Sequence, residues 1–387
     1  MKTMQAVILA AGEGRRLRPL THAMPKAMVP VANRPILEYI VRALEKNGIR
    51  EIIVVVGYKK EQVIRHLNGL EIPVKVVVQE RQLGTAHALK CAAPLITGDF
   101  LLLPGDNYID TASIARIMGE RNAVLTWDHP HPSNFGVLMI RDGSVQQVIE
   151  KPSEAPGFTV STGIFSLGPA FLDFLGDETE IPNAINAMIA AGTPLKAVPA
   201  EDWQDAIYPW DLLRLNAALL QGVRQERAGR IGSSVVIKGQ VSIGRGTTIG
   251  PNSTILGPVV IGEDCEIGPN CVVLPETSIG DRVRIEPFTL IGHSLILADA
   301  CIGSHARITD AVVGTGTQVG DHATTSPQRT IFSIEGELIR AKFGAIIGDN
   351  VRSAPFCVFK NCIVGNNVCV EDGKTLYGEV PDGARII

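Results

Sequence analysis

The 387-residue sequence lacks three features that would each define a class of protein. No stretch approaches the ~20 consecutive apolar residues that a membrane-spanning helix needs. The formal net charge is −4, so no global positive field exists to hold nucleic acid or an anionic membrane. The seven cysteines include no Cys-x-x-Cys pair, which fits a reducing compartment. We therefore expect a cytoplasmic protein that binds small molecules, with no nucleic acid and no membrane among its partners.

The apolar run near the start, residues 6–11, superficially looks like a signal peptide. The run is too short for one, and it leads into Arg15-Arg16-Leu17-Arg18. A buried first strand explains it better.

Two different periodicities divide the chain. In the first part, short aliphatic segments alternate with stretches of helical spacing at 36–46 and 86–93. The expected strands cover residues 6–10, 52–56, 74–78, 100–103 and 124–126. This alternation predicts an α/β domain, Rossmann-like, with a mixed, mostly parallel sheet and helices on both faces. Ligands of such sheets bind at the carboxyl ends of the strands.

From residue 231 onward, an aliphatic residue recurs every six positions, from Ile231 to Leu297, and glycine often follows it. Glycine suits a sharp corner where a side chain would clash. This hexapeptide period is the signature of a parallel β-helix. We expect residues 1–228 to form the first domain, with a linker helix at 212–227. Residues 229–387 then form the β-helix, interrupted by a loop near 324–344.

A glycine-rich turn, Gly12-Glu13-Gly14, follows the first predicted strand. Backbone N–H groups in such a turn can point at phosphate oxygens. Position 17 is Leu, so the third glycine of the dinucleotide fingerprint is missing, and so is the Lys-Ser/Thr ending of a Walker loop. Instead, Arg15 and Lys26 supply two cations beside this turn. The sequence thus indicates a phosphate site of a different kind.

The run from Leu9 to Lys26 resembles the signature of the sugar-phosphate nucleotidyltransferases, and further segments match in family order. These segments are residues 79–86, 101–107, 135–137, 150–152, 161–164 and 208–211. The resemblance implies Arg15, Lys26 and Asp106 as catalytic residues. It implies a nucleotide site made by Leu9, Ala11, Gly12, Gly14, Gln79, Gly84 and Thr85, with Thr85 as the N-cap of a helix. It implies a sugar-phosphate site made by Gly136, Glu150, Lys151 and Thr162.

The same resemblance implies a Mg²⁺ site at Asp106 and Asp211. Mg²⁺ prefers one or two carboxylates together with substrate phosphates and water. Asp211 could instead cap the helix that begins after it. The attacking sugar phosphate is already an anion, so the reaction needs alignment and charge neutralisation rather than a general base.

The residues of the two substrate sites leave the substrates open. The amide of Gln79 has both a donor and an acceptor, which suits the edge of a pyrimidine base. We expect UTP first and dTTP second as the nucleotide. Ser161 stands where relatives that use N-acetylglucosamine often have Asn, so the sugar is not fixed.

The combination of both halves in one chain resembles the archaeal-type bifunctional enzymes that are uridylyltransferases and acetyltransferases. That resemblance implies a left-handed β-helix, a homotrimer or higher homo-oligomer, and a second activity that uses acetyl-CoA to acetylate an amino-sugar phosphate. Phe288, however, stands where those relatives have their catalytic His, and 323–326 lack their Asn. His293, His305 and His322 are the remaining candidates for a base, or are surface residues.

A non-catalytic regulatory or assembly subunit is the alternative function. Such subunits usually lose the phosphate-binding cations and metal-binding carboxylates. Arg15, Lys26, Asp106 and Asp211 are all present here, which favours an enzyme.

Overall fold

The computed structural model describes residues 4–334 and 337–387. The chain forms two compact units. The first comprises Met1–Glu13, Pro25–Met28 and Ile36–Asp205, and the second comprises Gly14–Met24, Val29–Pro35 and Ala206–Ile387. The first unit therefore ends before the predicted boundary at residue 228.

A nine-stranded sheet organises the first unit, in the order β5-β4-β1-β6-β11-β8-β12-β10-β9. Its strands are β1 (Gln5–Ala10), β4 (Glu51–Val56), β5 (Val74–Val78), β6 (Phe100–Pro104), β8 (Ala123–Asp128), β9 (Gly136–Arg141), β10 (Ser144–Glu150), β11 (Thr159–Leu167) and β12 (Leu195–Pro199). The strands β5, β4, β1 and β6 run parallel, as do β8 and β12, whereas β11, β10 and β9 pair antiparallel. The prediction of an α/β unit is confirmed.

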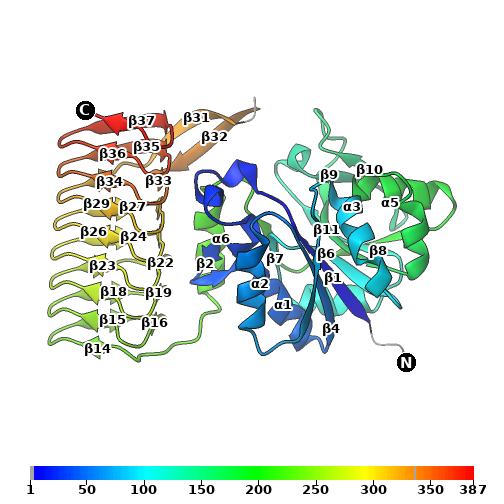
Figure 1. Ribbon diagram of the computed structural model, residues 1–387, viewed down its shortest axis with the longest axis horizontal. Coiled ribbons are helices and arrows are strands. Elements are labelled where there is room, and N and C mark those ends of the chain that lie inside the picture. Colours follow the sequence, from blue (N-terminus) through cyan, green and yellow to red (C-terminus); the bar gives the residue numbers. More distant parts are fainter. Residues whose placement is uncertain (1–3, 335–336) are drawn as a thin grey trace. The chain divides into compact units, whose positions relative to one another are not determined.

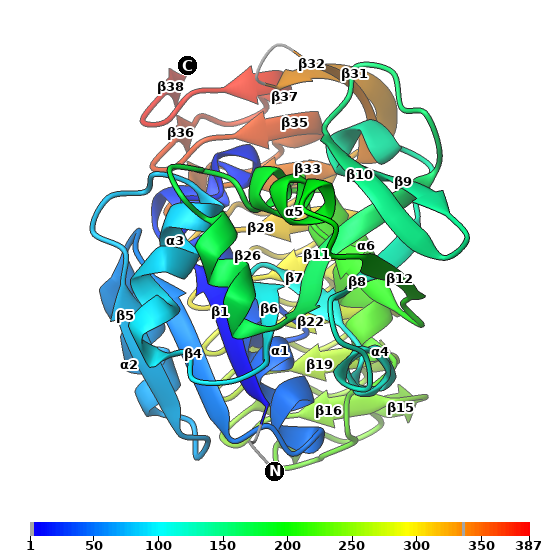
Figure 2. The ribbon, with the colours of Figure 1, turned by 90° about the vertical axis from the view of Figure 1, so that its right-hand side faces the viewer.

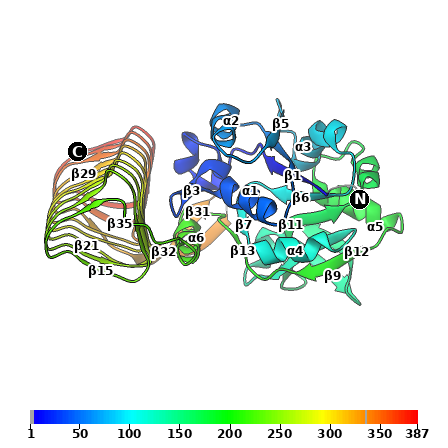
Figure 3. The same cartoon turned by 90° about the horizontal axis from the view of Figure 1, so that it is seen from below.

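Helices cover this sheet because its strands are apolar on both faces. The helices are α1 (Ile36–Lys46), α2 (Lys60–Asn68), α3 (Thr85–Ala92), α4 (Thr111–Met118) and α5 (Ile181–Ala190). One core joins α3 and α5 to side chains of β1, β4 and β6, and Figure 2 shows these two helices in front of the sheet. In Figure 3, α1 and α4 lie on the other side.

The helix α1 carries a buried ionic group. The carboxylate of Glu38, only 8% exposed, accepts a hydrogen bond from Arg42 Nε at 2.6 Å and lies 3.1 Å from His66 Nε2. Burial alone would raise the pKa of Glu38, but these two partners outweigh it and lower the pKa to about 2. Glu38 is therefore ionised over the physiological range.

The second unit is a coil of short parallel strands, a parallel β-helix, whose turns are stacked in Figure 1 and superposed in Figure 3. One face is built by β14 (Arg230–Ile231), β17 (Thr248–Ile249), β20 (Glu266–Ile267), β23 (Arg284–Ile285), β26 (Cys301–Ile302), β29 (Gln318–Val319), β34 (Arg352–Ser353), β36 (Cys369–Val370) and β38 (Arg385–Ile386). The other two faces contain β15 (Val236–Lys238), β18 (Thr254–Leu256), β21 (Val272–Val273), β24 (Leu290–Gly292), β27 (Arg307–Thr309), β30 (Thr324–Thr325), β35 (Val358–Val364), β37 (Thr375–Val380), β16 (Val241–Ile243), β19 (Val259–Ile261), β22 (Thr277–Ile279), β25 (Leu295–Ile296), β28 (Ala311–Val313) and β33 (Ala345–Ile347).

From Ile243 onward, the six-residue column of aliphatic side chains forms the interior of this coil, whereas Ile231 at its start is 41% exposed. Each turn pairs with the next at the same position, so Ile249 pairs with Ile267 and Ile267 with Ile285. One later turn is a residue shorter, because Ile279 pairs with Ile296. The column therefore passes through Ile296, and its predicted continuation at Leu297 was wrong.

Two further sequence predictions need correction. The interrupting segment predicted as a loop contains a hairpin, β31 (Gln328–Ile334) and β32 (Glu337–Phe343). The predicted linker helix is shorter, because α6 runs from Asp211 to Leu220 and ends in a turn at Gln221 and Gly222. This helix groups with the coil: Asn216 donates from Nδ2 to Glu276 O at 3.1 Å and accepts from Ser278 Oγ at 2.5 Å.

Candidate active site

The carboxyl end of β6 carries Asp106, as the strand rule predicted. The preceding Gly105 donates its N–H to Leu9 O at 2.8 Å, which joins the ends of β6 and β1. A Cβ on Gly105 would lie 2.7 Å from Ala10 Cβ, so no other residue fits between these strands. The side chain of Asp106 is 40% exposed and thus open to a ligand.

Lys26 lies between two carboxylates. Its Nζ is 3.0 Å from Asp106 Oδ2 and 2.9 Å from Asp205 Oδ1. Lys26 is 13% exposed and Asp205 19%, so this ion triad is mostly covered. Burial by itself would lower the pKa of Lys26, but the two carboxylates outweigh it and the pKa is raised. The ammonium group therefore stays charged at any physiological pH.

Asp205 is a site residue that the sequence predictions missed. It ends the short strand β13 (Trp203–Asp205), which pairs antiparallel with β7 (Asn107–Ile109), so that Asp205 stands opposite Asn107. This pairing brings residues next to each other that are far apart in the sequence. The chain has carboxylates at both 205 and 211, and spacing alone offered no means of choosing between them.

Asp211, the predicted second metal ligand, is the first residue of α6. Its Oδ2 accepts hydrogen bonds from the backbone N–H groups of Ile207 at 3.1 Å and Tyr208 at 2.9 Å. These bonds hold the turn that leads into α6. They agree with the alternative that Asp211 serves the start of this helix rather than a metal. Its pairing with Asp106 stays a prediction, while the structure places Asp205 near Asp106.

The polar atoms around β7 and β13 are incompletely satisfied. Asn107 is 3% exposed and donates from Nδ2 to Thr162 O at 3.2 Å. Its Oδ1, together with Trp203 Nε1 and Gln204 Oε1, is buried without a hydrogen-bond partner. These three atoms lie on the strand pair that sets Asp205 opposite Asn107.

Gln79, the predicted base-recognition residue, follows β5 and is 3% exposed. Its Nε2 lies 3.0 Å from Gly84 O, to which it donates, and 2.9 Å from His87 Nδ1. The structure thus fixes the amide within the segment 79–87. Contact of this amide with a base stays a prediction.

Gly84 and Thr85 open helix α3, but in a different way from the prediction. Gly84, not Thr85, is the N-cap residue, with φ +102°. A Cβ on Gly84 would lie 2.2 Å from Thr179 O, so glycine is required by its neighbours. Thr85 Oγ1 donates to Glu180 Oε2 at 2.8 Å and accepts from the N–H of Ile181 at 2.9 Å. Thr85 therefore ties α3 to the start of α5.

The glycine-rich turn is open on one side. Ala11 O accepts the N–H of Tyr58 at 3.0 Å, and a Cβ on Gly12 would meet nothing within 4 Å. Gly14, with φ +72°, precedes the 3-10 helix of Arg15–Leu17. Gly14 and Arg15 group with the second unit, so their action together with Lys26 on a triphosphate stays a prediction.

The predicted sugar-side residues Gly136, Glu150 and Lys151 come together on β9 and β10. Glu150 pairs with Gly136 across these strands. A Cβ on Gly136 would lie 3.1 Å from Glu150 Oε2, so glycine leaves room around the carboxylate. Lys151 Nζ lies 3.6 Å from Glu150 Oε1, and both side chains are about half exposed. An acceptor and a cation at one edge suit a phosphorylated polyol.

Thr162 faces away from this edge. It is 2% exposed, and its Oγ1 donates to Leu125 O at 3.0 Å and accepts from Ile164 N at 3.3 Å. These hydrogen bonds fix the Thr162 side chain within the sheet. Its backbone carbonyl accepts a hydrogen bond from Asn107, the residue after Asp106.

The donor set at Asp106 and Asp205 fits a hard divalent cation. Mg²⁺ takes oxygen ligands and needs only one or two from the protein. Among the residues that the structure describes, no group of three or more His, Cys, Asp or Glu side chains could hold a metal. A divalent cation held by Asp106 and Asp205 would complete its ligands with substrate phosphates and water. In the same described part of the chain, no helix is long and apolar enough to cross a membrane.

The first unit thus combines an α/β sheet with a cation between two carboxylates, and a β-helix makes up most of the second unit. The nucleotidyl transferase family model matches residues 5–222, and the model of the GMPPB C-terminal domain matches residues 255–380. The chain belongs to the nucleotidyl transferase family and is a sugar-1-phosphate nucleotidyltransferase.

Three relatives illustrate the similarity. The bifunctional protein GlmU of Methanococcus maripaludis strain C7 is 38% identical over 95% of both chains. The low-salt glycan biosynthesis nucleotidyltransferase Agl11 of Haloferax volcanii is 34% identical, covering 82% of this chain and 94% of its own. The UTP–glucose-1-phosphate uridylyltransferase AglF of the same organism is 37% identical, covering 54% of this chain and 93% of its own. Enzymes of this class act on a nucleoside triphosphate and a sugar 1-phosphate, generally with a divalent metal.

Proposed function

We propose that the protein transfers a nucleotidyl group from a pyrimidine nucleoside triphosphate to a sugar 1-phosphate and releases pyrophosphate, with Mg²⁺ as the metal. UTP is the first candidate and dTTP the second. The single observation that carries the proposal is Lys26 Nζ within 3.0 Å of both Asp106 and Asp205. The name of the uridylyltransferase relative adds support for UTP.

Charge repulsion between the two substrates is the obstacle that such a site must remove. Two like unit charges ~4 Å apart repel by about 4 kcal/mol at an effective dielectric of ~20. Lys26 would hold phosphate oxygens of the triphosphate, and Lys151 those of the sugar phosphate. Mg²⁺ held by Asp106 and Asp205 would supply further positive charge to the α-phosphate.

The remaining residues of the mechanism align the substrates. Glu150 would accept hydrogen bonds from sugar hydroxyls at the edge that Gly136 leaves open. The oxygen of the sugar phosphate attacks the α-phosphorus, and the bond to the leaving pyrophosphate breaks. The nucleophile carries its charge already, so no side chain has to take a proton and catalysis consists of alignment and charge stabilisation.

A pyrophosphate-release screen tests this proposal. It crosses four triphosphates with the 1-phosphates of glucose, glucosamine, N-acetylglucosamine, galactose and mannose, in the presence of Mg²⁺. Release with UTP or dTTP, abolished in Asp106→Ala, is expected. The absence of release from every pair would favour the regulatory-subunit alternative instead.

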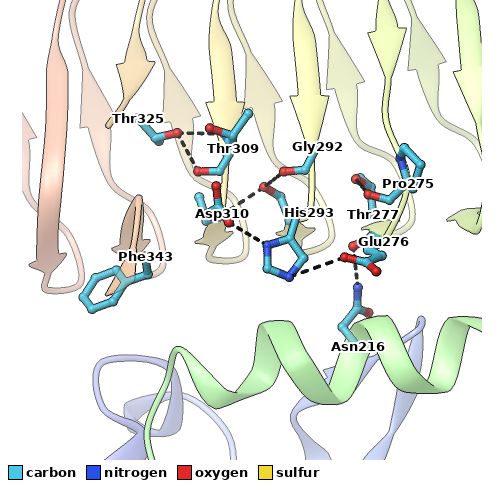
Figure 4. A network of polar contacts seen from close by, with 12 residues as sticks. Asn216, Pro275, Glu276, Thr277, Gly292, His293, Thr309, Asp310, Thr325 and Phe343 are labelled. Carbon is cyan, nitrogen blue, oxygen red and sulfur yellow. Dashed lines mark hydrogen bonds and ion pairs between the residues drawn. The ribbon is translucent and has the colours of Figure 1, made fainter. Parts of the chain in front are cut away.

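We propose acetyl-CoA-dependent N-acetylation of an amino-sugar phosphate as a second candidate activity. His293 Nδ1 lies 2.7 Å from Asp310 Oδ1 in the coil (Figure 4), and a carboxylate-oriented imidazole is a common general base. The name of one relative, a bifunctional protein, is compatible with a second activity. Acetyl-CoA with glucosamine 1-phosphate should release free thiol, and His293→Asn should abolish that release. Thiol release at the uncatalysed rate would eliminate the candidate.

We also propose that the coil winds left-handed, which the hexapeptide spacing and the parallel pairing of successive turns support. We propose that the chain assembles through this coil as a homotrimer or higher homo-oligomer, and that it works in the cytoplasm. Light scattering after size-exclusion chromatography measures the mass of the assembly. A monomeric mass at micromolar concentration would contradict it.

A further inference from the structure

Residues 14–24 group with the coil, although the residues on either side of them in the chain belong to the first unit. This stretch, which we call the Arg15 segment, carries the predicted phosphate-binding cation Arg15 in an exposed position. Its turns are tied together, because Gly14 O accepts hydrogen bonds from Leu17 N at 3.0 Å and from Thr21 Oγ1 at 2.8 Å. A movement of Thr21 is therefore passed on to Gly14, the residue next to Arg15.

Two side chains from the last turns of the coil hold the Arg15 segment. Asn366 is 6% exposed and donates from Nδ2 to Pro19 O at 3.1 Å. His22 Nδ1 lies 3.1 Å from the same amide nitrogen and 2.8 Å from Asp382 Oδ2. These contacts lie on either side of Thr21 in the chain. The end of the coil therefore fixes the part of the segment from which Thr21 reaches back.

The coil alone does not account for an amide at position 366. Asp349, Asn366 and Asp382 occupy the same corner in three successive turns. The Oδ1 atom of each accepts a backbone N–H from the turn before, that of Thr315 at 2.7 Å, of residue 349 at 2.6 Å and of residue 366 at 2.7 Å. This bond needs only an acceptor, which Asp and Asn both supply. The amide adds a donor, and at 366 that donor meets the carbonyl of Pro19.

We propose that Asn366 and Asp382 are positioning residues for nucleotidyl transfer, which keep Arg15 in place to bind the triphosphate. They act through the Arg15 segment rather than on the substrate. A cation that the fold holds in place loses less conformational freedom on binding than a mobile one, so its loss should appear in the KM of the triphosphate. The inference rests on the proposed nucleotidyl transfer and on the predicted role of Arg15 in it.

The first test measures the anchor itself, without substrate. Asn366→Asp keeps the Oδ1 acceptor and removes the Nδ2 donor, while Asp349→Asn makes the reverse exchange one turn away and is the matched control. Hydrogen exchange of the full chain, followed by mass spectrometry, should be about tenfold faster across residues 14–24 in Asn366→Asp. The control should exchange like the wild type. Wild-type exchange in Asn366→Asp would overturn the inference, whatever the enzyme turns over.

The second test measures pyrophosphate release with UTP and Mg²⁺. We expect Asn366→Asp to raise the KM for UTP about tenfold at an unchanged melting temperature, and Asp349→Asn to keep wild-type kinetics. Asp382→Asn keeps the acceptor for the N–H of residue 366 but removes the carboxylate beside His22, so it should raise the same KM. A wild-type KM in both anchor variants would overturn the inference while the proposed function stands.

A double-mutant cycle separates positioning of Arg15 from a general loss of structure. In an Arg15→Gln background, Asn366→Asp should cause no further loss of kcat/KM, because the two changes remove the same interaction. A full additional tenfold loss in that background would assign the effect to structure alone and overturn the inference. A wild type that releases no pyrophosphate from any substrate pair would overturn the proposed function and, with it, this role of Asn366.

Discussion

Lys26 Nζ and Asp205 Oδ1 lie 2.9 Å apart although 179 positions separate the two residues in the chain. The pairing of β13 with β7 creates this contact, because it sets Asp205 opposite Asn107, the residue that follows Asp106. Lys26 therefore meets both carboxylates, and the site gains an acidic residue that motif order did not reveal.

The two candidate metal carboxylates, at 205 and 211, can be separated by substitution. Asp205→Asn should lower kcat about 100-fold or more, because it removes a charged ligand from the phosphate site. Asp211→Asn should mainly weaken the turn that precedes α6 and lower the melting temperature. Steady-state kinetics at several Mg²⁺ concentrations measures the difference, and the reverse pattern would restore Asp211 as the ligand.

Replacing Lys26 by Met should also reduce kcat/KM about 100-fold or more, since the triphosphate loses a buried cation. Lys26→Arg keeps the charge but not the compact geometry, and should recover part of the activity. Rates of pyrophosphate release at UTP concentrations from well below to well above KM compare the two variants. Equal rates for the Met variant and the wild type would remove Lys26 from the mechanism.

The buried carboxylate of Glu38 should make the first unit sensitive to acid. Its pKa is lowered from 4.5 to about 2, so the stabilisation is complete above pH 4.5 and is lost as the pH falls from there toward 2. That loss corresponds to roughly 3 kcal/mol at most. Glu38→Gln should unfold with a weaker pH dependence between pH 4.5 and 2, followed by far-UV circular dichroism. An unchanged acid transition would show that other groups control it.

Gly84→Ala should destabilise the first unit by about 2 kcal/mol or more. The alanine would need φ +102°, and its Cβ would lie 2.2 Å from Thr179 O. Gly12→Ala is the matched control, because a Cβ there meets nothing within 4 Å. Urea unfolding monitored by circular dichroism compares them. Similar midpoints for both variants would contradict the steric argument.

His293 should make the coil less stable in alkaline solution. Its hydrogen bond to Asp310 raises the pKa of His293, with a contribution from Glu276, whose Oε2 lies 3.8 Å from Nε2. The stabilisation is therefore complete below pH 6.5 and is lost as the pH rises through the folded-state pKa. His293→Asn should flatten the fall in melting temperature between pH 6 and 9. A fall as steep as that of the wild type would assign it to other groups.

Periodicity predicted most of the fold because each period reflects a burial pattern. The strands at 52–56 and 74–78 and the helix at 36–46 were found within one residue, since continuous apolar runs and helical spacing leave little choice. The coil was predicted from one repeated aliphatic position. The sequence also showed that the column is out of phase at Ile302 and Ile308, but it placed the change after Leu297 instead of before Ile296, because both neighbouring residues are apolar.

The site was harder to predict because it depends on pairing between distant segments. Motif order predicted Lys26, Asp106 and the Glu150–Lys151 pair as site residues, and the structure brings Lys26 next to Asp106. It did not place Asp205, since a three-residue strand such as β13 has too few residues to show a pattern. The N-cap role of Gly84 depends on the position of Thr179, which lies in a separate segment. Such choices become visible only when the chain is folded.

The hairpin β31–β32 enters the coil between β30 and β33, yet β28 still pairs with β33 residue for residue, from Ala311 with Ala345 to Val313 with Ile347. The coil thus accepts an insertion at a corner without losing the alignment of the turns on either side. That corner is a natural attachment point for foreign peptide: an epitope, a fluorophore-labelling tag or a small domain could extend the hairpin and leave the stacked turns undisturbed.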